Sequence, residues 1–99
     1  MRIEVTGKHL DLTPPITEYA EQKCGKLTRY YDGVQEIDIV LEQTRGEEFE
    51  VEVRVEVVKH DTFVAKAAGN DIYKCIDATV EKMSRQLTDF KEKLKNSKR

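Results

Sequence analysis

Residues 48–57 read EFEVEVRVEV, an unbroken alternation of charged and apolar side chains. Because successive side chains of a strand point to opposite faces of a sheet, this pattern predicts a long β-strand with one face in water and the other in the core. The segment before it repeats the alternation, with Ile37, Ile39 and Leu41 separated by mostly acidic residues. Residues 45–47 (RGE) supply a turn. The centre of the chain therefore predicts two paired strands with an acidic outer face.

Two more strands are predicted on either side of this pair. Residues 2–6 alternate polar and apolar side chains, and residues 62–68 form another β-like run. His60 and Asp61 separate that run from the central strand. A hairpin is therefore predicted there, although the turn lacks the usual glycine.

Two helices are predicted from apolar side chains that recur at helical spacing. Residues 13–14 (TP) supply an N-cap and a first-turn proline for the first helix, and residues 32–33 (DG) end it. Gly25 lies inside this pattern and weakens it. Asn70 is the expected N-cap of the second helix, which runs to about Lys95. The apolar positions are Ile16, Ala20, Cys24, Leu27 and Tyr31 in the first helix and Ile72, Ile76, Val80, Met83, Leu87, Phe90 and Leu94 in the second.

The predicted order of elements is β-α-β-β-β-α, which indicates an α+β fold. A right-handed β-α-β crossover makes the first two strands parallel, and hairpins make the others antiparallel. The expected architecture is a two-layer α/β sandwich, a four-stranded mixed sheet with two helices packed on one face, similar to a double-stranded-RNA-binding-domain arrangement. A length of 99 residues indicates a single domain at residues 1–95, followed by a basic tail at 96–99 that we expect to fray.

Charge is unevenly distributed along the chain, although the total is nearly balanced. Seventeen Lys and Arg against 19 Asp and Glu give a net charge of −2 and a pI of about 5.7, which excludes a uniformly basic nucleic-acid binder. Residues 32–61 hold ten acids and three bases, whereas residues 62–99 hold nine bases and five acids. In the predicted fold, most acids lie on the outer face of the sheet and the helix bases lie on the opposite side.

The helix bases predict a broad basic surface with tyrosines near it. Its members are Lys26 and Arg29 with Lys23 on the flank beside Tyr19 and Tyr30, and Lys74, Lys82, Arg85 and Lys93 with Asp89 among them. Such a surface suits contact with a phosphate backbone, while the acidic sheet repels the same polyanion. Lysine-rich helix exteriors are also common as plain solvated faces, and composition alone favours that second interpretation.

Nearly the whole chain carries motifs of one known family. The opening motif is made by Ile3, Val5, Gly7, Lys8, Leu10, Leu12, Thr13, Ile16, Tyr19, Lys23, Lys26, Leu27 and Tyr30. The closing motif is more specific and reads D-x-Y-x-x-I-D from Asp71, then R-Q-L-x-x-x-K from Arg85. In these residues the chain resembles the ribosome hibernation-promoting factor family, also called ribosome-associated inhibitors, ribosomal subunit interface proteins or sigma-54 modulation proteins. The predicted order of elements is also that family's order.

This resemblance implies a translation-inhibiting factor of the stress response. Such proteins bind the small ribosomal subunit in the mRNA and tRNA channel and keep idle ribosomes inactive by steric occlusion. The implied partners are the small subunit with its ribosomal RNA and the whole ribosome, without a membrane, small-molecule substrate, cofactor or metal. Carried over by position, the RNA-binding candidates are Lys23, Lys26, Arg29, Lys82, Arg85 and Lys91, followed by Lys8 and Lys74.

Two features bear on the type of family member. Long members continue into a second, dimerising domain, and nothing in this chain provides one, so ribosome pairing through that domain is not expected. Some short members end in an acidic tail, whereas residues 95–99 (KNSKR) are basic and resemble the short hibernation-promoting form. The N-terminal domain of a long member would look the same, so the natural length stays open. Tyr73 matches a motif residue, but its place at the helix start equally suits packing.

Other functional classes match the sequence less well. His9 and His60 are isolated, no P-loop or G-x-G-x-x-G occurs, and the carboxylates lie along strand exteriors, so neither an enzyme nor a metal protein is expected. A generic structured-RNA-binding module is one alternative, although the GXXG loop of KH domains and the aromatic strand of RRM domains are missing. A protein-interaction domain of the sigma-factor modulator type, using the acidic sheet, is the other alternative.

Cysteine usage and hydropathy point to a cytoplasmic protein. Cys24 and Cys75 lie among helix-periodic apolar residues, so both are expected in the core rather than in a disulfide. No apolar run approaches the ~18 residues of a transmembrane helix, and no signal peptide opens the chain.

Overall fold

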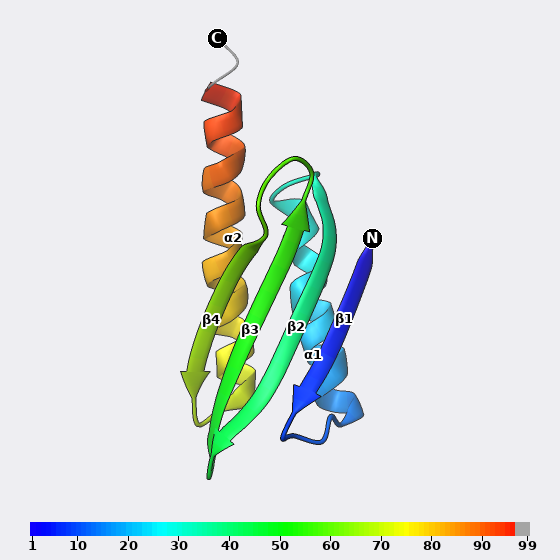
Figure 1. The fold of residues 1–99 in the computed structure, drawn as a ribbon, viewed down its shortest axis with the longest axis vertical. Coiled ribbons are helices and arrows are strands. Elements are labelled where there is room, and N and C mark those ends of the chain that lie inside the picture. The colour runs from blue at the N-terminus through cyan, green and yellow to red at the C-terminus, as the bar shows by residue number, and fades with distance from the viewer. Residues whose placement is uncertain (97–99) are drawn as a thin grey trace.

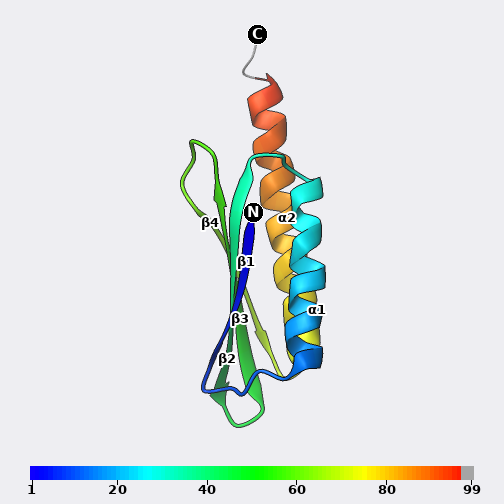
Figure 2. The ribbon, with the colours of Figure 1, turned by 90° about the vertical axis from the view of Figure 1, so that its right-hand side faces the viewer.

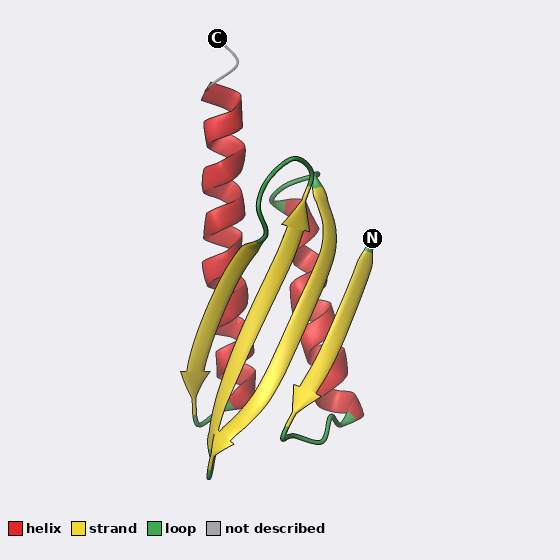
Figure 3. Cartoon of the chain, in the orientation of Figure 1, coloured by secondary structure: helices red, strands yellow, loops and turns green. Residues whose placement is uncertain are grey.

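Four strands form one layer, and two helices cover the same face of it (Figure 1; Figure 3). The computed structural model describes residues 1–96. The elements are β1 (Arg2–Lys8), α1 (Pro14–Gly25), the 3-10 helix η1 (Lys26–Arg29), β2 (Val34–Arg45), β3 (Glu48–Val57), β4 (Phe63–Gly69) and α2 (Ile72–Asn96). The predicted α+β fold and its order of elements are confirmed. Of the predicted tail, Asn96 still belongs to α2, and 97–99 lie outside the described residues.

The strand order is β1-β2-β3-β4, with β1 parallel to β2 and the other two pairs antiparallel. The register places Val5 beside Ile39 and Ile39 beside Val53, so the apolar side chains form one continuous inner face. Seen edge-on in Figure 2, both helices lie on one side of the sheet. The charged alternate residues therefore face water, as the alternation predicts.

The core lies between the two layers and is made of aliphatic side chains. Its fully buried members include Ile37, Ile39, Leu41, Val51, Val53 and Val55 from the sheet and Ala20, Cys24, Leu27, Ile76, Met83 and Leu87 from the helices. Thr79 of α2 is buried among them, and its hydroxyl donates a hydrogen bond to the Cys75 carbonyl at 2.7 Å. Cys24 and Cys75 are both buried and unpaired, as predicted.

The first helix is shorter than the sequence predicts. Its α-helical geometry ends at Gly25, and η1 continues the chain with a tighter turn instead of one helix reaching residues 32–33. Glycine costs about 1 kcal/mol in a helix interior relative to alanine. The hydroxyl of Thr28 donates to the Gly25 carbonyl at 3.1 Å, which gives that helix end a partner. Leu27 is still fully buried, so the tighter turn keeps it in the core.

The second helix begins one residue later than predicted and extends beyond the sheet (Figure 1). Asp71, rather than Asn70, is the N-cap, because its Oδ1 accepts hydrogen bonds from the backbone N–H of Tyr73 at 3.0 Å and of Lys74 at 3.3 Å. A carboxylate at this position also interacts favourably with the helix dipole. At the other end, Leu94 is 38% exposed, so the predicted apolar stripe of α2 continues beyond the part of the helix that packs on the sheet.

The turns and strand ends account for the remaining differences. Lys59 adopts a φ of 57° in the β3–β4 turn, which explains how that hairpin forms without a glycine. Strand β1 continues to Lys8, two residues beyond the prediction, because the alternation passes through Gly7. A Cβ atom on Gly7 would lie 2.6 Å from the Leu10 carbonyl oxygen, so a side chain does not fit there.

Candidate nucleic-acid interface

The two layers carry opposite excesses of charge. Within residues 1–96, the helix face, which is the outer side of α1, η1 and α2, has nine bases (Lys23, Lys26, Arg29, Lys74, Lys82, Arg85, Lys91, Lys93, Lys95) and six acids (Glu18, Glu21, Asp77, Glu81, Asp89, Glu92). The sheet face, which is the outer side of β1 to β4, has seven acids (Glu4, Glu36, Asp38, Glu42, Glu50, Glu52, Glu56) and four bases (Arg2, Lys8, Arg54, Lys66).

A groove separates the first helical segment from α2. Lys23, Lys26 and Tyr30 line it on the α1 and η1 side, while Asp77, Val80, Glu81 and Ser84 line it on the α2 side, around a volume of about 280 Å³. Tyr30 is 42% exposed. This interhelix groove therefore combines two cations, two carboxylates and an accessible aromatic ring.

Tyr19 and Asp77 join the two helices beside this groove. The Tyr19 hydroxyl donates to Asp77 Oδ1 at 2.6 Å, and Lys23 Nζ lies 3.8 Å from the same oxygen and 5.3 Å from the centre of the Tyr19 ring. The hydrogen bond to Asp77, with smaller contributions from burial and nearby carboxylates, raises the pKa of Tyr19 to about 12. Tyr73 packs edge-on against Tyr19 at 5.0 Å, so this motif residue has a packing contact while remaining 38% exposed.

The other basic residues of α2 lie toward β4 or on the exterior. Lys82 Nζ donates to the Lys66 carbonyl at 2.7 Å, and Gln86 Nε2 donates to the Val64 carbonyl at 3.0 Å. These side chains satisfy two outward-facing carbonyls of the edge strand. On the exterior, Arg85 Nη2 lies 2.5 Å from Glu81 Oε1.

The candidate residues on the helices fall into two groups according to what lies beside them. One group lies on the α1 and η1 side (Lys23 and Lys26 in the interhelix groove, Arg29 at the end of η1), with Lys91 near Tyr31. The other group lies along α2 and toward β4 (Lys74, Lys82, Arg85, Lys93). Asp77 and Glu81 stand between them. Sequence analysis missed these two acids as groove residues, although their spacing of four places them on one side of a helix.

Lys8 belongs to neither group. It lies at the end of β1 in register with Glu42 and lines a hollow of the sheet face with Glu50, Glu52 and Lys66. The strand predicted from the sequence ended at residue 6. Because β1 continues to Lys8, the two-residue period sends this side chain to the face opposite the helices.

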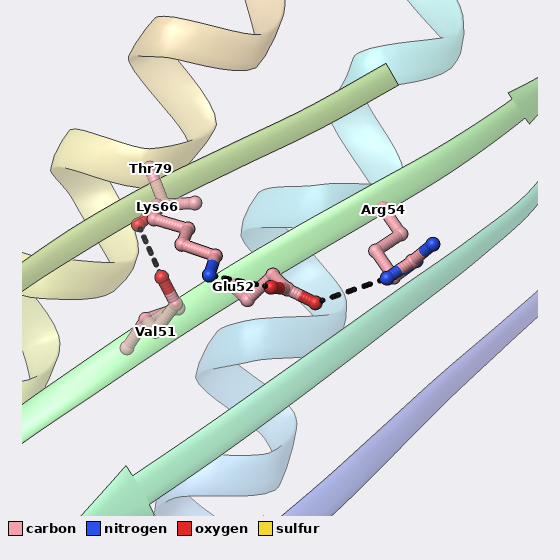
Figure 4. A network of polar contacts seen from close by, with 5 residues as sticks. All are labelled: Val51, Glu52, Arg54, Lys66 and Thr79. Atoms are coloured by element: carbon pink, nitrogen blue, oxygen red, sulfur yellow. Dashed lines mark hydrogen bonds and ion pairs between the residues drawn. The ribbon is translucent and has the colours of Figure 1, made fainter. Parts of the chain in front are cut away.

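The bases of the sheet face are engaged by neighbouring acids. Glu52 lies between Lys66 Nζ at 3.3 Å and Arg54 Nη1 at 3.5 Å (Figure 4). In the same view the Thr79 hydroxyl reaches from α2 to the Val51 carbonyl at 3.5 Å, which links α2 to β3. The exposed cations of this face thus already have carboxylate partners close by.

Several acids of the sheet face are nevertheless opposed by other acids. The β2–β3 register places Glu36 directly beside Glu56 and Glu42 beside Glu50. The hydrogen bond and charge of Glu36 raise the pKa of Glu56, and Arg2, 3.1 Å from Glu36, partly offsets this. Like charges placed across two strands repel each other, so this face has an uncompensated negative potential.

The described residues contain neither an activated thiol nor a cluster of metal-binding side chains. Burial raises the pKa of the Cys24 thiol to about 12, and burial together with nearby carboxylates raises the pKa of Cys75, so neither thiol is an activated nucleophile. Among residues 1–96, no group of three or more His, Cys, Asp or Glu side chains is arranged to hold a metal ion. No helix in this part of the chain is both long and apolar enough to cross a membrane.

Comparison with known proteins places this fold among ribosome-associated proteins. Residues 3–95 match the family described as "Sigma 54 modulation protein / S30EA ribosomal protein". The ribosome hibernation promoting factor of Escherichia coli K12 is 30% identical over 105 residues, covering 96% of this chain and 98% of the relative. The factor of the same name from Pseudomonas putida KT2440 is 27% identical, covering 94% and 89%.

Two solved structures share the fold closely. A ribosomal subunit interface protein from Coxiella burnetii superimposes with a TM-score of 0.84 at 27% identity and covers 93% of this chain and 99% of that one. The N-terminal domain of Protein Y from Thermus thermophilus superimposes with a TM-score of 0.81 at 28% identity, covering 91% and 99%. These matches confirm the resemblance drawn from the opening and closing motifs.

Proposed function

Because the chain belongs to the Sigma 54 modulation protein / S30EA ribosomal protein family, we propose that it is a cytoplasmic ribosome hibernation factor that binds ribosomal RNA of the small subunit. Its relatives are named for ribosome hibernation and for the ribosomal subunit interface. The observation that carries the proposal is the division of charge between the two layers. An excess of bases on the helix face attracts a phosphate backbone, and the acidic sheet face repels it.

The proposed contacts are seven of the nine basic residues of the helix face. They are Lys23, Lys26, Arg29, Lys74, Lys82, Arg85 and Lys91. Lys8 is left out, because it lies among acids on the sheet face. With the helix face against RNA, the sheet face points away from it, so the charge pattern supports a single binding orientation.

The proposed mechanism is steric and breaks no bond. The domain, held by its helix face between the head and body of the small subunit, occupies the space that mRNA and tRNA need. Binding then competes with initiation and reverses when growth resumes. The buried thiols and the solvated carboxylates fit this non-catalytic role.

Co-sedimentation with purified ribosomes and separated subunits, over a series of salt concentrations, tests the proposal. We expect binding to the small subunit and the whole ribosome that weakens steeply with salt, by about 0.7–0.9 in the log–log slope for each neutralised phosphate. The Lys82→Glu/Arg85→Glu and Lys26→Glu/Arg29→Glu variants should bind weakly, each testing one group of bases. Glu50→Lys, on the sheet face opposite Glu42, is the matched charge-reversal control.

A second candidate follows from the family description, which includes sigma-54 modulation. The sheet face offers seven acids to a basic protein partner. If the folded chain fails to bind ribosomes at low salt, the hibernation proposal falls and this protein-interaction role gains. If ribosome binding is lost in Glu50→Lys and kept in the helix-face variants, the orientation proposed above is wrong.

A further inference from the structure

The interhelix groove contains an aromatic ring, which attraction between charges gives no role. Tyr30 follows η1 directly, is 42% exposed and lines the groove together with Lys23 and Lys26. Tyr31, the next residue, instead packs against Phe90 at 5.2 Å on the inner side. The chain thus directs one of two adjacent tyrosines to the core and leaves the other on a basic rim.

We propose that this groove binds a single unpaired nucleotide of RNA, with its base stacked on Tyr30 and its phosphate on Lys26 and Lys23. Every base has a π-face, so an exposed aromatic ring beside cations is the usual platform for single-stranded nucleic acid. The volume of about 280 Å³ suits one nucleotide and is too small for a helix or a duplex. This inference rests on the proposed function and adds a site for one nucleotide within it.

The opposite wall of the groove gives the site a chemical preference. Asp77 and Glu81 are held in place, Asp77 by Tyr19 and Glu81 by Arg85. A carboxylate accepts several hydrogen bonds, and the exocyclic amino groups of cytosine, adenine and guanine can donate to it. Uracil has no amino group. The groove therefore favours an amino-bearing base over uracil, and its two acids disfavour a polyanion that brings no base.

Tyr30→Trp provides a direct test, because the chain contains no tryptophan and the new indole would be the single fluorophore of its kind. We expect short single-stranded oligo(C) and oligo(A) to quench its fluorescence, while inorganic polyphosphate, a polyanion without bases, binds without quenching it. Equal quenching by polyphosphate would overturn the site. So would unchanged fluorescence when the anisotropy of a labelled oligonucleotide shows that it is bound.

Two apolar substitutions, one aromatic and one aliphatic, separate stacking from simple apolar contact. Tyr30→Phe should bind oligo(C) as the wild type does, whereas Tyr30→Leu should bind it about 5- to 150-fold more weakly, the range observed for loss of one stacked base. Equal affinities of the two variants would contradict stacking. Both should remain folded, because Tyr30 is 42% exposed and is not one of the buried core residues.

Glu81→Gln tests the base preference. We expect the wild type to bind oligo(C) more tightly than oligo(U), and the variant to lose most of that ratio. An unchanged ratio, or a wild type that favours oligo(U), would overturn the role of the carboxylate wall.

Ribosome co-sedimentation of Tyr30→Leu distinguishes failure of this site from failure of the proposed function. If Lys26→Glu/Arg29→Glu loses the ribosome while Tyr30→Leu binds like the wild type, the hibernation role stands and the nucleotide site falls. If the folded wild type binds neither ribosomes nor oligonucleotides, both fall.

Discussion

The helix face and the sheet face contain the same kinds of charged residue, but they differ in which charges lie next to each other. On the helix face, an acid stands beside several of the bases, as Asp77 does for Lys23 and Glu81 for Arg85. On the sheet face, the strand register places acid against acid at Glu36–Glu56 and Glu42–Glu50, as well as acid against base at Glu52–Lys66. Helical spacing of four residues lets Glu81 meet Arg85, and the packing of α1 on α2 brings Lys23 to Asp77. In the sheet, the register alone decides which charges lie opposite each other.

This difference shows where a polyanion can be accepted. The exposed ion pairs of the helix face are individually weak, at about 0–1 kcal/mol, so a phosphate can replace a carboxylate partner there at little cost. On the sheet face a phosphate gains little by replacing a carboxylate, because the surplus charge of this face has the same sign as RNA. The following predictions test this comparison, from the largest expected effect to the smallest.

Charge reversal on the helix face should have the largest effect. Lys26→Glu/Arg29→Glu should lower ribosome affinity by about tenfold or more for each lost contact, since a hydrogen bond to a charged group contributes about 1.5–3 kcal/mol. Both residues are exposed, so folding should change by only about 0.5 kcal/mol. The Kd from co-sedimentation and a urea melt measure the two effects. A gain in affinity for Glu50→Lys as large as this loss would mean that net charge, and not the helix face, governs binding.

Removing the Tyr19 hydroxyl should have the next largest effect, this time on stability. Tyr19→Phe loses the bond to Asp77 that joins α1 to α2, and we expect the free energy of unfolding to fall by about 1 kcal/mol at pH 8. The pKa of Tyr19 is raised from about 10 to about 12 in the folded protein, so the stabilisation is complete below pH 10 and is lost as the pH rises toward 12.

Urea unfolding of the wild type and Tyr19→Phe at a series of pH values measures this dependence. The stability difference between the two proteins should shrink between pH 10 and 12. A difference that stays constant to pH 12 would show that the hydroxyl contributes by packing and not through its proton.

Substitution of Lys82 tests whether this residue of α2 also stabilises the edge strand β4. Lys82→Met keeps the aliphatic stem but loses the bond to the Lys66 carbonyl, and should lower the free energy of unfolding by about 0.5 kcal/mol because the site is exposed. Compared with the wild type, the variant should show faster backbone hydrogen exchange in β4 but not in β1, which would locate the lost stability at the β4 edge. Unchanged exchange in β4 would show that the bond does not protect the edge strand.

Relief of repulsion on the sheet face should have the smallest effect. Glu56→Gln removes one of two opposed carboxylates and should raise the melting temperature slightly at pH 7. The pKa of Glu56 is raised on folding, so its contribution to stability is present at low pH and is lost as the pH rises through that pKa. The advantage of the variant should therefore vanish near pH 3. An equal advantage at both pH values would rule out the carboxyl pair as its cause.

Much of the fold was predictable because the signals are local. The alternation over residues 48–57 determined a strand and its wet face, and the apolar spacing from Ile72 determined a helix and its buried side. The cap at Asp71 was misassigned to Asn70, since both side chains can cap and only the backbone path selects between them. Gly25 itself signalled the early end of α1, because glycine destabilises a helix interior. The sequence alone did not show whether packing of a longer helix would outweigh this cost.

Less of the candidate site was predictable. The helical period predicted which side of its helix each basic residue occupies. The sequence also placed Tyr30 beside these bases. The position of Lys8 on the sheet face was not predicted, because the predicted strand ended at residue 6 although the alternation continues through Gly7. The partners of Lys23 and Lys82 lie 54 and 16 residues away along the chain, beyond the reach of any local pattern.

The sequence by itself determined the elements, the inner side of each and the opposite charges of the two layers, because side-chain periods of two and 3.6 residues are properties of a single strand or helix. Only the tertiary structure decided that Asp77 and Glu81 divide the bases, that Lys82 seals the edge of β4 and that Tyr30 lines a groove between helices. A period assigns a residue to a face. Which neighbour lies across that face depends on how distant elements pack, and that is settled only when the core closes.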